Sequence, residues 1–241
     1  MKSLESALLK QVPQIRHAFG TAAEPVGTAL QKDWKQGQPI WKQVHGTELA
    51  RVLDPRQTCG EVDALWTDTP GCPVGVATAD CVPLLLAEKT GRAVVAIHAG
   101  WRGTKDQILR PVFRSLRQAG YEPQDFVAAI GPCIQPCCFE VGPEVVETFL
   151  NQFPQLDESL LLPRPRHLDL PWIHEATLRG FGIEQIDSLR VCTKCGRDNE
   201  GNSWLLHSYR REGSGHRQWS IIIKDDQDCA SLNTDHTKTI T

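Results

Sequence analysis

The sequence predicts an α+β protein of a single domain, in which helices flank a mixed β-sheet. Three observations lead to this prediction: apolar β-branched runs recur along the chain, amphipathic segments of helical period separate some of them, and the two kinds do not alternate strictly. A length of 241 residues with 40% hydrophobic residues suits one large core. We assign the domain to residues 1–224 and a polar, unpatterned tail to residues 225–241.

The first half of the chain predicts a loop and two buried strands. Residues 23–40 are rich in Gly, Pro and Gln and are typical of a loop. Residues 74–88 form an apolar strand that a polar Thr-Ala-Asp-Cys interrupts just before Pro83. Residues 92–100 form a second apolar strand, which Gly100 ends.

The second half predicts helices and further strands. Residues 104–120 show the pattern of an amphipathic helix, but Pro111 removes one hydrogen bond inside it and should kink it. Residues 125–134 form a third strand. The remaining expected elements are helices at 142–153 and 170–182 and strands at 188–193, 203–208 and 217–224.

Charge and hydropathy exclude several classes of partner. There are 26 basic and 29 acidic residues, a net charge of −3, so no strong positive field attracts nucleic acid or an anionic membrane. The apolar runs are far shorter than the roughly 20 residues that span a bilayer. Glu5 and Lys10 break the N-terminal apolar stretch, which argues against a signal peptide. We therefore expect a cytoplasmic protein without nucleic-acid or membrane partners, either a monomer or a homodimer.

Two of the predicted strands carry reactive side chains near their ends. Asp80 and Cys81 precede Pro83, and His98 precedes the turn at Gly100. Polar side chains that interrupt buried strands cost free energy unless they are paired or hold a ligand. With His45 as a third member, two imidazoles and a thiolate would form a zinc site with an open fourth position, the catalytic type. The spacing of the three matches no short metal motif.

The segment HAGWRGT (98–104) suggests an anion site. Free backbone amides, Gly100, Gly103 and the Arg102 guanidinium come together where a helix is expected to begin. Such a helix N-terminus with an arginine suits a phosphate group.

Nine cysteines in a chain without a secretion signal are expected to be thiols. Three interpretations stay open for Cys192-x-x-Cys195: a redox pair, two unpaired structural thiols, or half of a structural zinc site. In the last case Cys133 and either Cys137 or Cys138 would supply the other ligands.

Several known motifs are absent from the sequence. It contains neither a P-loop nor a G-x-G-x-x-G dinucleotide fingerprint. It also contains no His-x-His pair, whereas copper oxidases need several imidazoles around a copper cluster. Copper is therefore disfavoured as the cofactor.

Six segments of the chain form a recognisable pattern: QVHGT (43–47), DALWTDTPG (63–71), TADCVPLLL (78–86), HAGWRGT (98–104), IGPCIQPCCFEVG (130–142) and SYRREG with GHRQWS (208–220). In the order and spacing of these segments, over residues 40–224, the chain resembles the YfiH-like laccase-domain family, whose members are also described as peptidoglycan editing factors and purine nucleoside phosphorylases.

The resemblance implies a zinc ion held by His45, Cys81 and His98. It implies phosphorolysis of purine nucleosides (adenosine, inosine, guanosine and methylthioadenosine), with adenosine deamination as a second activity. Purine nucleosides and phosphate are then the expected partners. An older assignment to copper-dependent polyphenol oxidation also attaches to the family, and the missing His-x-His pairs argue against it here.

Other residues receive expected roles within this interpretation. Arg102 is the first candidate for holding phosphate, and Arg210 and Arg211 are further ones. Gln43 of the first motif is a candidate for substrate binding. Asp80 is expected either to act as a general base or to position a ligand histidine.

Two alternatives to the phosphorylase stay open. In one, Cys81 is the nucleophile and His98 the base of a hydrolase that acts on peptidoglycan precursors or amides. In the other, the protein is a non-catalytic metal- or nucleotide-binding partner of cell-wall enzymes. The sequence assigns no role to Asp68, and His207 is either an additional ligand or a packing residue.

Overall fold

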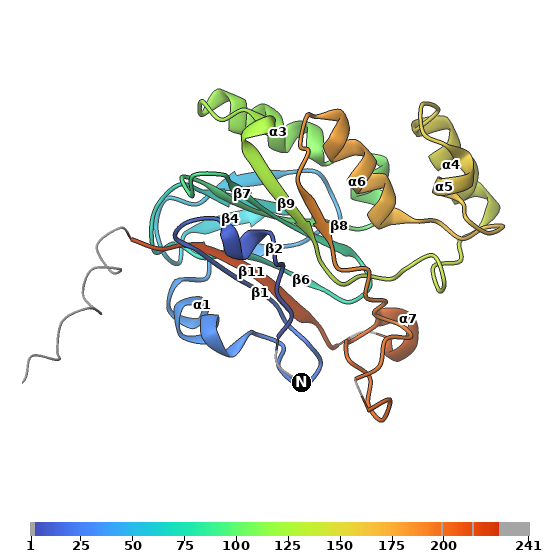
Figure 1. Cartoon of the computed structure of the whole chain (residues 1–241), viewed down its shortest axis with the longest axis horizontal. Coiled ribbons are helices and arrows are strands. Elements are labelled where there is room, and N and C mark those ends of the chain that lie inside the picture. Colours follow the sequence, from blue (N-terminus) through green and yellow to red (C-terminus); the bar gives the residue numbers. More distant parts are fainter. Residues whose placement is uncertain (1–2, 199, 214, 227–241) are drawn as a thin grey trace, which may run out of the picture.

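Two β-sheets pack face to face between helices in the computed structural model, which describes residues 3–198, 200–213 and 215–226 (Figure 1). The strands are β1 (Ile15–Phe19), β2 (Ile40–Lys42), β3 (Leu49–Arg51), β4 (Thr58–Glu61), β5 (Ala64–Thr67), β6 (Val74–Thr78), β7 (Val82–Glu88), β8 (Val94–Ala99), β9 (Phe126–Ile130), β10 (Ile186–Ser188) and β11 (Gln218–Lys224). The α-helices are α1 (Gln31–Gly37), α2 (Trp101–Lys105), α3 (Leu109–Gln118), α4 (Pro143–Gln152), α5 (Glu158–Leu161), α6 (Leu170–Gly180) and α7 (Tyr209–Glu212). Short 3-10 helices are η1 (Leu9–Gln11), η2 (Thr28–Leu30) and η3 (Pro123–Asp125).

The larger sheet is mixed and has the strand order β10-β9-β7-β8-β5-β3. Its centre is antiparallel, because β7 pairs antiparallel with both β8 and β9, while the outer pairs β9/β10 and β5/β3 are parallel. The smaller sheet is antiparallel, in the order β1-β11-β6. Strands β2 and β4 form a separate parallel pair.

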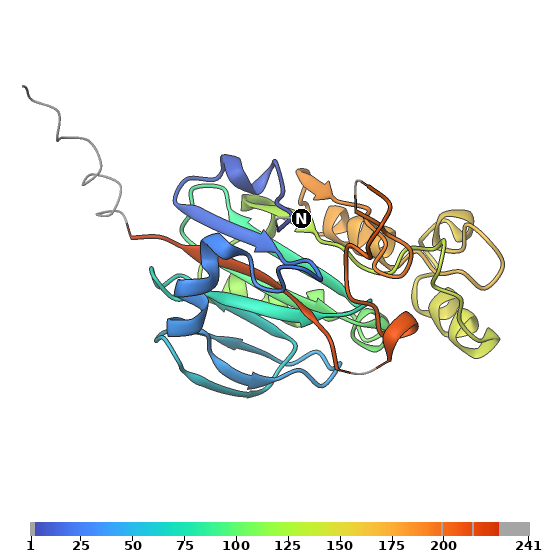
Figure 2. The ribbon, with the colours of Figure 1, turned by 90° about the horizontal axis from the view of Figure 1, so that it is seen from below.

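Alternate side chains of β7 fill two different cores, as the period of a strand requires. Leu84 and Leu86 pack with α3 and α6 on one face of the larger sheet. Leu85 and Ala87 pack against the smaller sheet on the other face. A third cluster, around Trp34, seats α1 on the outer face of the smaller sheet. Figures 1 and 2 show these layers, with α1 lying across β11 on the side opposite α3 and α6.

The α+β class and the mixed sheet flanked by helices are therefore confirmed. The expected elements at 92–100, 125–134, 142–153, 170–182 and 217–224 correspond to β8, β9, α4, α6 and β11. The expected single strand at 74–88 is two strands, β6 and β7, and they belong to different sheets. The polar Thr-Ala-Asp-Cys is the corner between them, and Asp80 takes a φ of 95° there.

The expected helix at 104–120 is two helices, α2 and α3. Pro111 is the third residue of α3, so its missing N–H costs nothing at that position. In a continuous helix its ring would meet the carbonyl of Gln107. Gln107 instead has a φ of 58°, and the chain restarts as α3.

Four further expectations need correction or limits. The segment 203–208 is not a strand, and its apolar pair Leu205 and Leu206 is buried without strand pairing. Of the expected strand at 188–193, only Ser188 lies in β10. The expected loop at 23–40 contains α1. In the predicted tail, Asp225 pairs with Arg16, and residues 227–241 lie outside the described residues.

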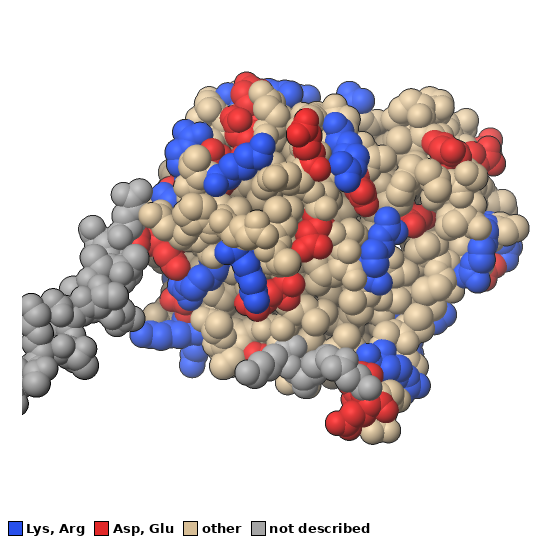
Figure 3. Space-filling view, in the orientation of Figure 1, with Lys and Arg blue, Asp and Glu red and all other residues tan. Residues whose placement is uncertain are grey.

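The distribution of surface charge and the hydropathy of the helices are relevant to the partners expected from the sequence. Basic and acidic side chains are interspersed over the face shown in Figure 3. Among the described residues, no helix combines the length and apolar character that crossing a membrane requires.

Candidate active site

Three parts of the fold bring His45, Cys81 and His98 together. His45 lies in the turn 43–48 between β2 and β3, Cys81 ends the corner before β7, and His98 lies in β8. Since β7 pairs with β8 so that Pro83 is opposite His98, Cys81 lies beside the end of β8. The possible ligand atoms of the three residues all lie within 4.8 Å of one another. We call these three residues the triad.

A buried carboxylate holds both histidines of the triad. Asp63 is fully buried, and its Oδ1 lies 2.7 Å from Nδ1 of His98. The same carboxylate accepts hydrogen bonds from the backbone N–H groups of Val44, His45 and Gly46, at 3.2, 3.0 and 2.7 Å. Because Nδ1 of His98 is engaged by Asp63, Nε2 is the nitrogen left for the triad. Carboxylate–histidine pairs of this kind orient metal ligands.

The sequence reasoning did not single out Asp63. The available signal was its position: it directly precedes a strand, β5, in which every residue is buried. Burial raises the pKa of this carboxyl. The bonds to His98 and to the backbone amides lower the pKa by more than burial raises it, so that the net shift is downward.

Cys81 and His98 form an electrostatic pair. Burial raises the pKa of Cys81, but His98 and His45 outweigh this effect and lower it to about 6. Burial lowers the pKa of His98, but the Cys81 sulfur and Asp63 outweigh this effect and raise it to about 9. At neutral pH the sulfur is therefore a thiolate, the form that binds metals and attacks electrophiles.

Two glycines allow α2 to approach the triad. A Cβ at Gly100 would lie 2.9 Å from Cδ2 of His45 and 3.1 Å from Sγ of Cys81. A Cβ at Gly103 would lie 2.9 Å from the carbonyl oxygen of Gly46. The HAGWRG segment thus needs both glycines for packing around the triad, which accounts for their place in the sequence pattern.

The triad opens onto a cavity of about 570 Å³, which we call the triad cavity. Its aromatic wall includes Trp41 and Trp219, whose ring centroids are 5.7 Å apart. Arg56 and Arg217 line it as well, and sequence reasoning named neither. Arg217 could have been found through its place in the GHRQWS motif, whereas Arg56 lies in no recognised motif. The full lining is Gln38, Pro39, Ile40, Trp41, Gln43, His45, Arg56, Ala77, Ala79, Cys81, His98, Arg217 and Trp219.

Gln43 lines the triad cavity, and its side-chain amide is bonded to β6. Its Nε2 donates to the carbonyl of Ala77 at 2.9 Å, and its Oε1 accepts from the N–H of Ala77 at 2.8 Å. This pair of bonds fixes the QVHG turn against the smaller sheet.

The arginines that the sequence predicts to bind phosphate are not among the described residues that line the triad cavity. Arg102 is exposed on α2, with its guanidinium 4.4 Å from the ring centroid of Trp101. Arg211 donates to the carbonyls of Thr193 and Lys194, both at 2.8 Å. Neither is among the residues that line the triad cavity in the described chain.

Arg210 lines a second, smaller cavity of about 390 Å³. Its guanidinium donates to the carbonyl of Glu140 at 2.9 Å, and the cavity also contacts Trp101, Phe139 and Arg166. This cavity lies beside the turn that carries Asp80, because the backbone N–H of Arg210 donates to Oδ2 of Asp80 at 2.7 Å.

Both carboxylate oxygens of Asp80 have partners. The hydroxyl of Thr193 donates to Oδ1 at 2.6 Å, and the Arg210 amide donates to Oδ2. Asp80 is also nearly buried. The carboxylate therefore ties two later loops to the corner that carries Cys81, an arrangement that suits positioning.

Asp68 and His207 have partners of their own. Asp68 binds the guanidinium of Arg51 at 2.6 Å and accepts from the hydroxyl of Tyr121 at 3.2 Å. Nδ1 of His207 lies 3.1 Å from Glu212, and its ring stacks on His216. Among the described residues, His207 is not part of the group of ligand atoms around Cys81.

Comparison with known proteins adds three findings. A family model described as multi-copper polyphenol oxidoreductase laccase matches residues 24–225. The Escherichia coli (strain K12) protein named purine nucleoside phosphorylase YfiH is 32% identical over 187 residues, covering 77% of this chain and 73% of that protein. A protein named adenosine deaminase RL5, from an unknown prokaryotic organism, is 37% identical over 169 residues, covering 64% of each chain.

A solved structure agrees with the fold. The crystal structure of a Neisseria meningitidis protein of the DUF152 family superposes with a TM-score of 0.78, at 24% identity. The match covers 94% of this chain and 100% of that one.

Proposed function

Because this chain belongs to the YfiH-like laccase-domain family, we propose that it is a zinc-dependent purine nucleoside phosphorylase with adenosine deamination as a second activity. The observation that carries the proposal is the triad itself: three ligand side chains that meet at one wall of a cavity of about 570 Å³. Cavities of that size accommodate a ligand the size of a nucleoside.

The donor set fits zinc. Two imidazoles and one thiolate with an open side are typical of catalytic zinc sites. Asp63 fixes the ring of His98, and Gly100 leaves room for the three side chains to converge. Copper oxidases need more imidazoles than the two, His45 and His98, that this group contains. When bound, zinc would supply a Lewis acid for a phosphate or ribose oxygen, or a water of lowered pKa for attack at purine C6.

The walls of the triad cavity suit the two substrates of phosphorolysis. Trp41 and Trp219 offer aromatic faces on which a purine ring stacks. Arg56 and Arg217 supply the positive charge that a phosphate dianion requires. We assign phosphate to these two arginines in place of Arg102, since they line the cavity that the triad faces.

The reaction makes one bond and breaks one. An oxygen of hydrogen phosphate attacks C1′ of the ribose while the bond from C1′ to N9 breaks. The proton that the phosphate loses balances the one that N9 of the leaving purine takes up. The chain's contribution is to hold the dianion beside the sugar and to exclude competing water, which is a task of positioning and charge.

A second candidate function rests on the Cys81–His98 pair. A thiolate whose pKa is lowered to about 6 by an adjacent imidazole is also the nucleophile of cysteine hydrolases. The two candidates differ in the state of Cys81. A zinc ligand is protected from iodoacetamide, whereas a nucleophile is alkylated and the enzyme loses activity.

Product analysis tests the proposal. The zinc-loaded protein is incubated with inosine or adenosine, in phosphate and in phosphate-free buffer, beside a chelator-treated sample. We expect hypoxanthine or adenine together with ribose 1-phosphate, only in phosphate and only with zinc. Absence of turnover in the zinc-loaded protein would overturn the proposal. Alkylation of Cys81 that abolishes a phosphate-independent hydrolysis would favour the second candidate.

A further inference from the structure

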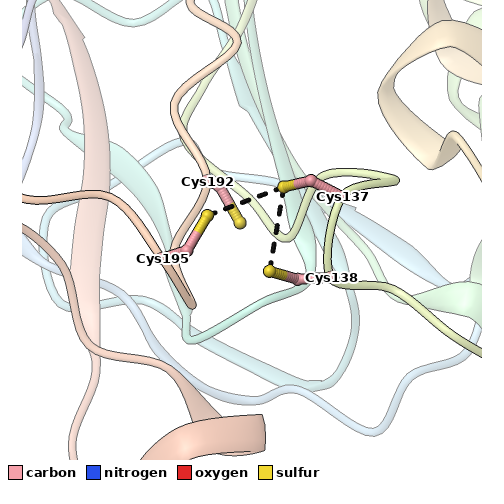
Figure 4. A group of neighbouring side chains, drawn as sticks. All are labelled: Cys137, Cys138, Cys192 and Cys195. Carbon is pink, nitrogen blue, oxygen red and sulfur yellow. Dashed lines mark hydrogen bonds between the residues drawn. The ribbon is translucent and has the colours of Figure 1, made fainter.

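Four cysteines outside the triad meet between two loops (Figure 4). Cys137 and Cys138 lie in the segment 131–139 after β9, and Cys192 and Cys195 lie in the loop after β10. Figure 4 shows their four sulfur atoms directed toward a common point, and all lie within 4.8 Å of one another. We call these four residues the cysteine cluster.

The spacing of the sulfur atoms is that of a tetrahedral metal site. Sγ of Cys137 lies 3.7 Å from Sγ of Cys138 and 3.6 Å from Sγ of Cys195. Four thiolates at about 2.3 Å from a tetrahedral zinc ion are separated by about 3.8 Å from one another. A disulfide requires about 2.05 Å, so these sulfurs are at metal-site spacing and not at bonding distance.

The sequence Cys-Thr-Lys-Cys-Gly at 192–196 folds as a tight turn around one sulfur. The N–H of Gly196 donates to the carbonyl of Cys192 at 2.8 Å, and a Cβ at Gly196 would lie 2.5 Å from that oxygen. Backbone N–H groups of Gln135, Lys194 and Cys195 are directed at the Cys192 sulfur. Backbone amides directed at a sulfur stabilise a thiolate, the form in which cysteine binds metal.

Cys133 does not belong to this cluster. It is fully buried, and its sulfur accepts a hydrogen bond from the side-chain amide of Gln135 at 3.2 Å. Its backbone forms an isolated bridge with Cys192. Cys133 therefore packs the joint between the two loops, while Cys137 and Cys138 are the two that face Cys192 and Cys195.

We propose that Cys137, Cys138, Cys192 and Cys195 bind one zinc ion in a closed, structural site that clamps the segment 131–139 to the loop after β10. Four thiolates fill a tetrahedral zinc ion and leave no position for substrate, which is typical of structural sites. The site requires nothing of the triad and does not rest on the proposed enzymatic function.

The proposed clamp would also support the active-site corner. Thr193 lies between two of the cluster cysteines, and its hydroxyl donates to Asp80, the neighbour of Cys81. Arg211 holds the carbonyls of Thr193 and Lys194 in the same turn. Zinc at the cluster would thereby fix the turn on which the Asp80 carboxylate is anchored.

Metal counting in the full chain tests the site without depending on the triad. In Cys81→Ser protein, which removes a triad ligand, elemental analysis after dialysis is expected to find about one zinc ion per chain. The double variant Cys81→Ser/Cys195→Ser is expected to lose that ion. The matched control Cys81→Ser/Cys59→Ser changes a cysteine outside both groups and should retain it.

Cobalt exchange in the same Cys81→Ser protein reports the ligands directly. We expect the intense visible and near-ultraviolet absorption of a tetrahedral cobalt thiolate, absent from the Cys195→Ser double variant. A Cys81→Ser protein that binds neither zinc nor cobalt would overturn the proposal. So would iron in place of zinc, or a disulfide between cluster cysteines found by mass spectrometry.

Discussion

The triad and the cysteine cluster are both groups of side chains that could bind a metal ion, but their surroundings differ. The triad lies where strands of the larger sheet end, a buried carboxylate orients it, and it faces the triad cavity. The cysteine cluster joins two loops and has four candidate ligands instead of three. In metal sites generally, three ligands with an open side are typical of catalytic zinc and four thiolates of structural zinc, so the two groups suit different roles.

The two groups also differ electrostatically. Histidine neighbours lower the pKa of Cys81 to about 6, whereas burial and the thiols of Cys195 and Cys192 raise the pKa of Cys138 to about 11. The histidines of the triad thus favour the thiolate form of Cys81. In the cysteine cluster, backbone amides favour the thiolate form of Cys192. The other thiols would lose their protons when a cation binds.

Replacing Cys81 should affect the triad strongly and leave the cysteine cluster intact. Cys81→Ser should reduce phosphorolysis to background, because the triad loses its thiolate, while zinc at the cluster is retained. Turnover of inosine and zinc content are measured on the same preparation. Turnover that survives in Cys81→Ser protein would mean that the triad is not the reactive centre.

A smaller effect is expected at the carboxylate that orients the triad. Asp63→Asn keeps the shape but weakens the bond to His98, and loss of such a partner costs about 10–100-fold in metal affinity or activity. Zinc affinity and turnover are measured in parallel. The control Asp68→Asn removes a carboxylate that pairs with Arg51 and Tyr121 and should change neither. Equal losses in both variants would contradict the orienting role.

The effect of one cavity arginine should be smaller again. Arg217→Gln removes one charged hydrogen-bond donor from the triad cavity, worth about 1.5 kcal/mol, or roughly tenfold in kcat/KM for phosphate. The nucleoside KM should change less than the phosphate KM. Arg114→Gln, on the exposed face of α3, is the matched control. An unchanged phosphate KM in Arg217→Gln would remove Arg217 from the phosphate site.

The last expected effect is on the stability of the fold and does not involve the reaction. Burial lowers the pKa of His174 to about 3, and its Nε2 lies 2.8 Å from Oγ1 of Thr104, in α2. As the pH decreases, the imidazole of residue 174 is therefore protonated in the unfolded chain before it is protonated in the folded chain. The contribution of His174 to the free energy of unfolding is complete above about pH 6.5 and falls as the pH decreases toward 3. Between pH 7 and pH 5 this amounts to about 2 kcal/mol.

His174→Gln should reduce that loss of stability by the same amount. The free energy of unfolding is measured in urea at the two pH values. Part of the loss of stability should remain in His174→Gln, because burial also lowers the pKa of His17 to about 4. His167→Gln, at a partly exposed histidine, is the control. An unchanged pH dependence in His174→Gln would show that the folded state accommodates the protonated ring.

Much of the central sheet could be predicted from the sequence, because β7 and β8 are mostly apolar and every residue of both is buried. The apolar pattern alone led to the wrong prediction of a strand around Leu205 and Leu206, because a buried apolar pair need not belong to a strand. It also predicted one strand where the chain passes from one sheet to the other at the corner containing Asp80, because the periodicity of side chains does not indicate a change of sheet.

The triad could be proposed because polar side chains near the ends of buried strands are costly without a partner. Asp63 was missed because the residues it holds are distant in sequence, and only the folded chain brings its carboxylate to His98. Arg56 was missed for a similar reason: it lies on a loop, and the loop's position over the triad cavity depends on tertiary packing.

We propose that the triad performs the chemistry once it holds zinc. This is tested by following phosphate-dependent release of hypoxanthine from inosine while zinc is removed from the wild-type protein and then restored. We expect turnover to be lost with the metal, to return with it, and never to appear in Cys81→Ser protein at any zinc concentration. Turnover by metal-free wild-type protein, or none by the zinc-loaded protein, would show that the zinc-loaded triad is not the catalytic centre.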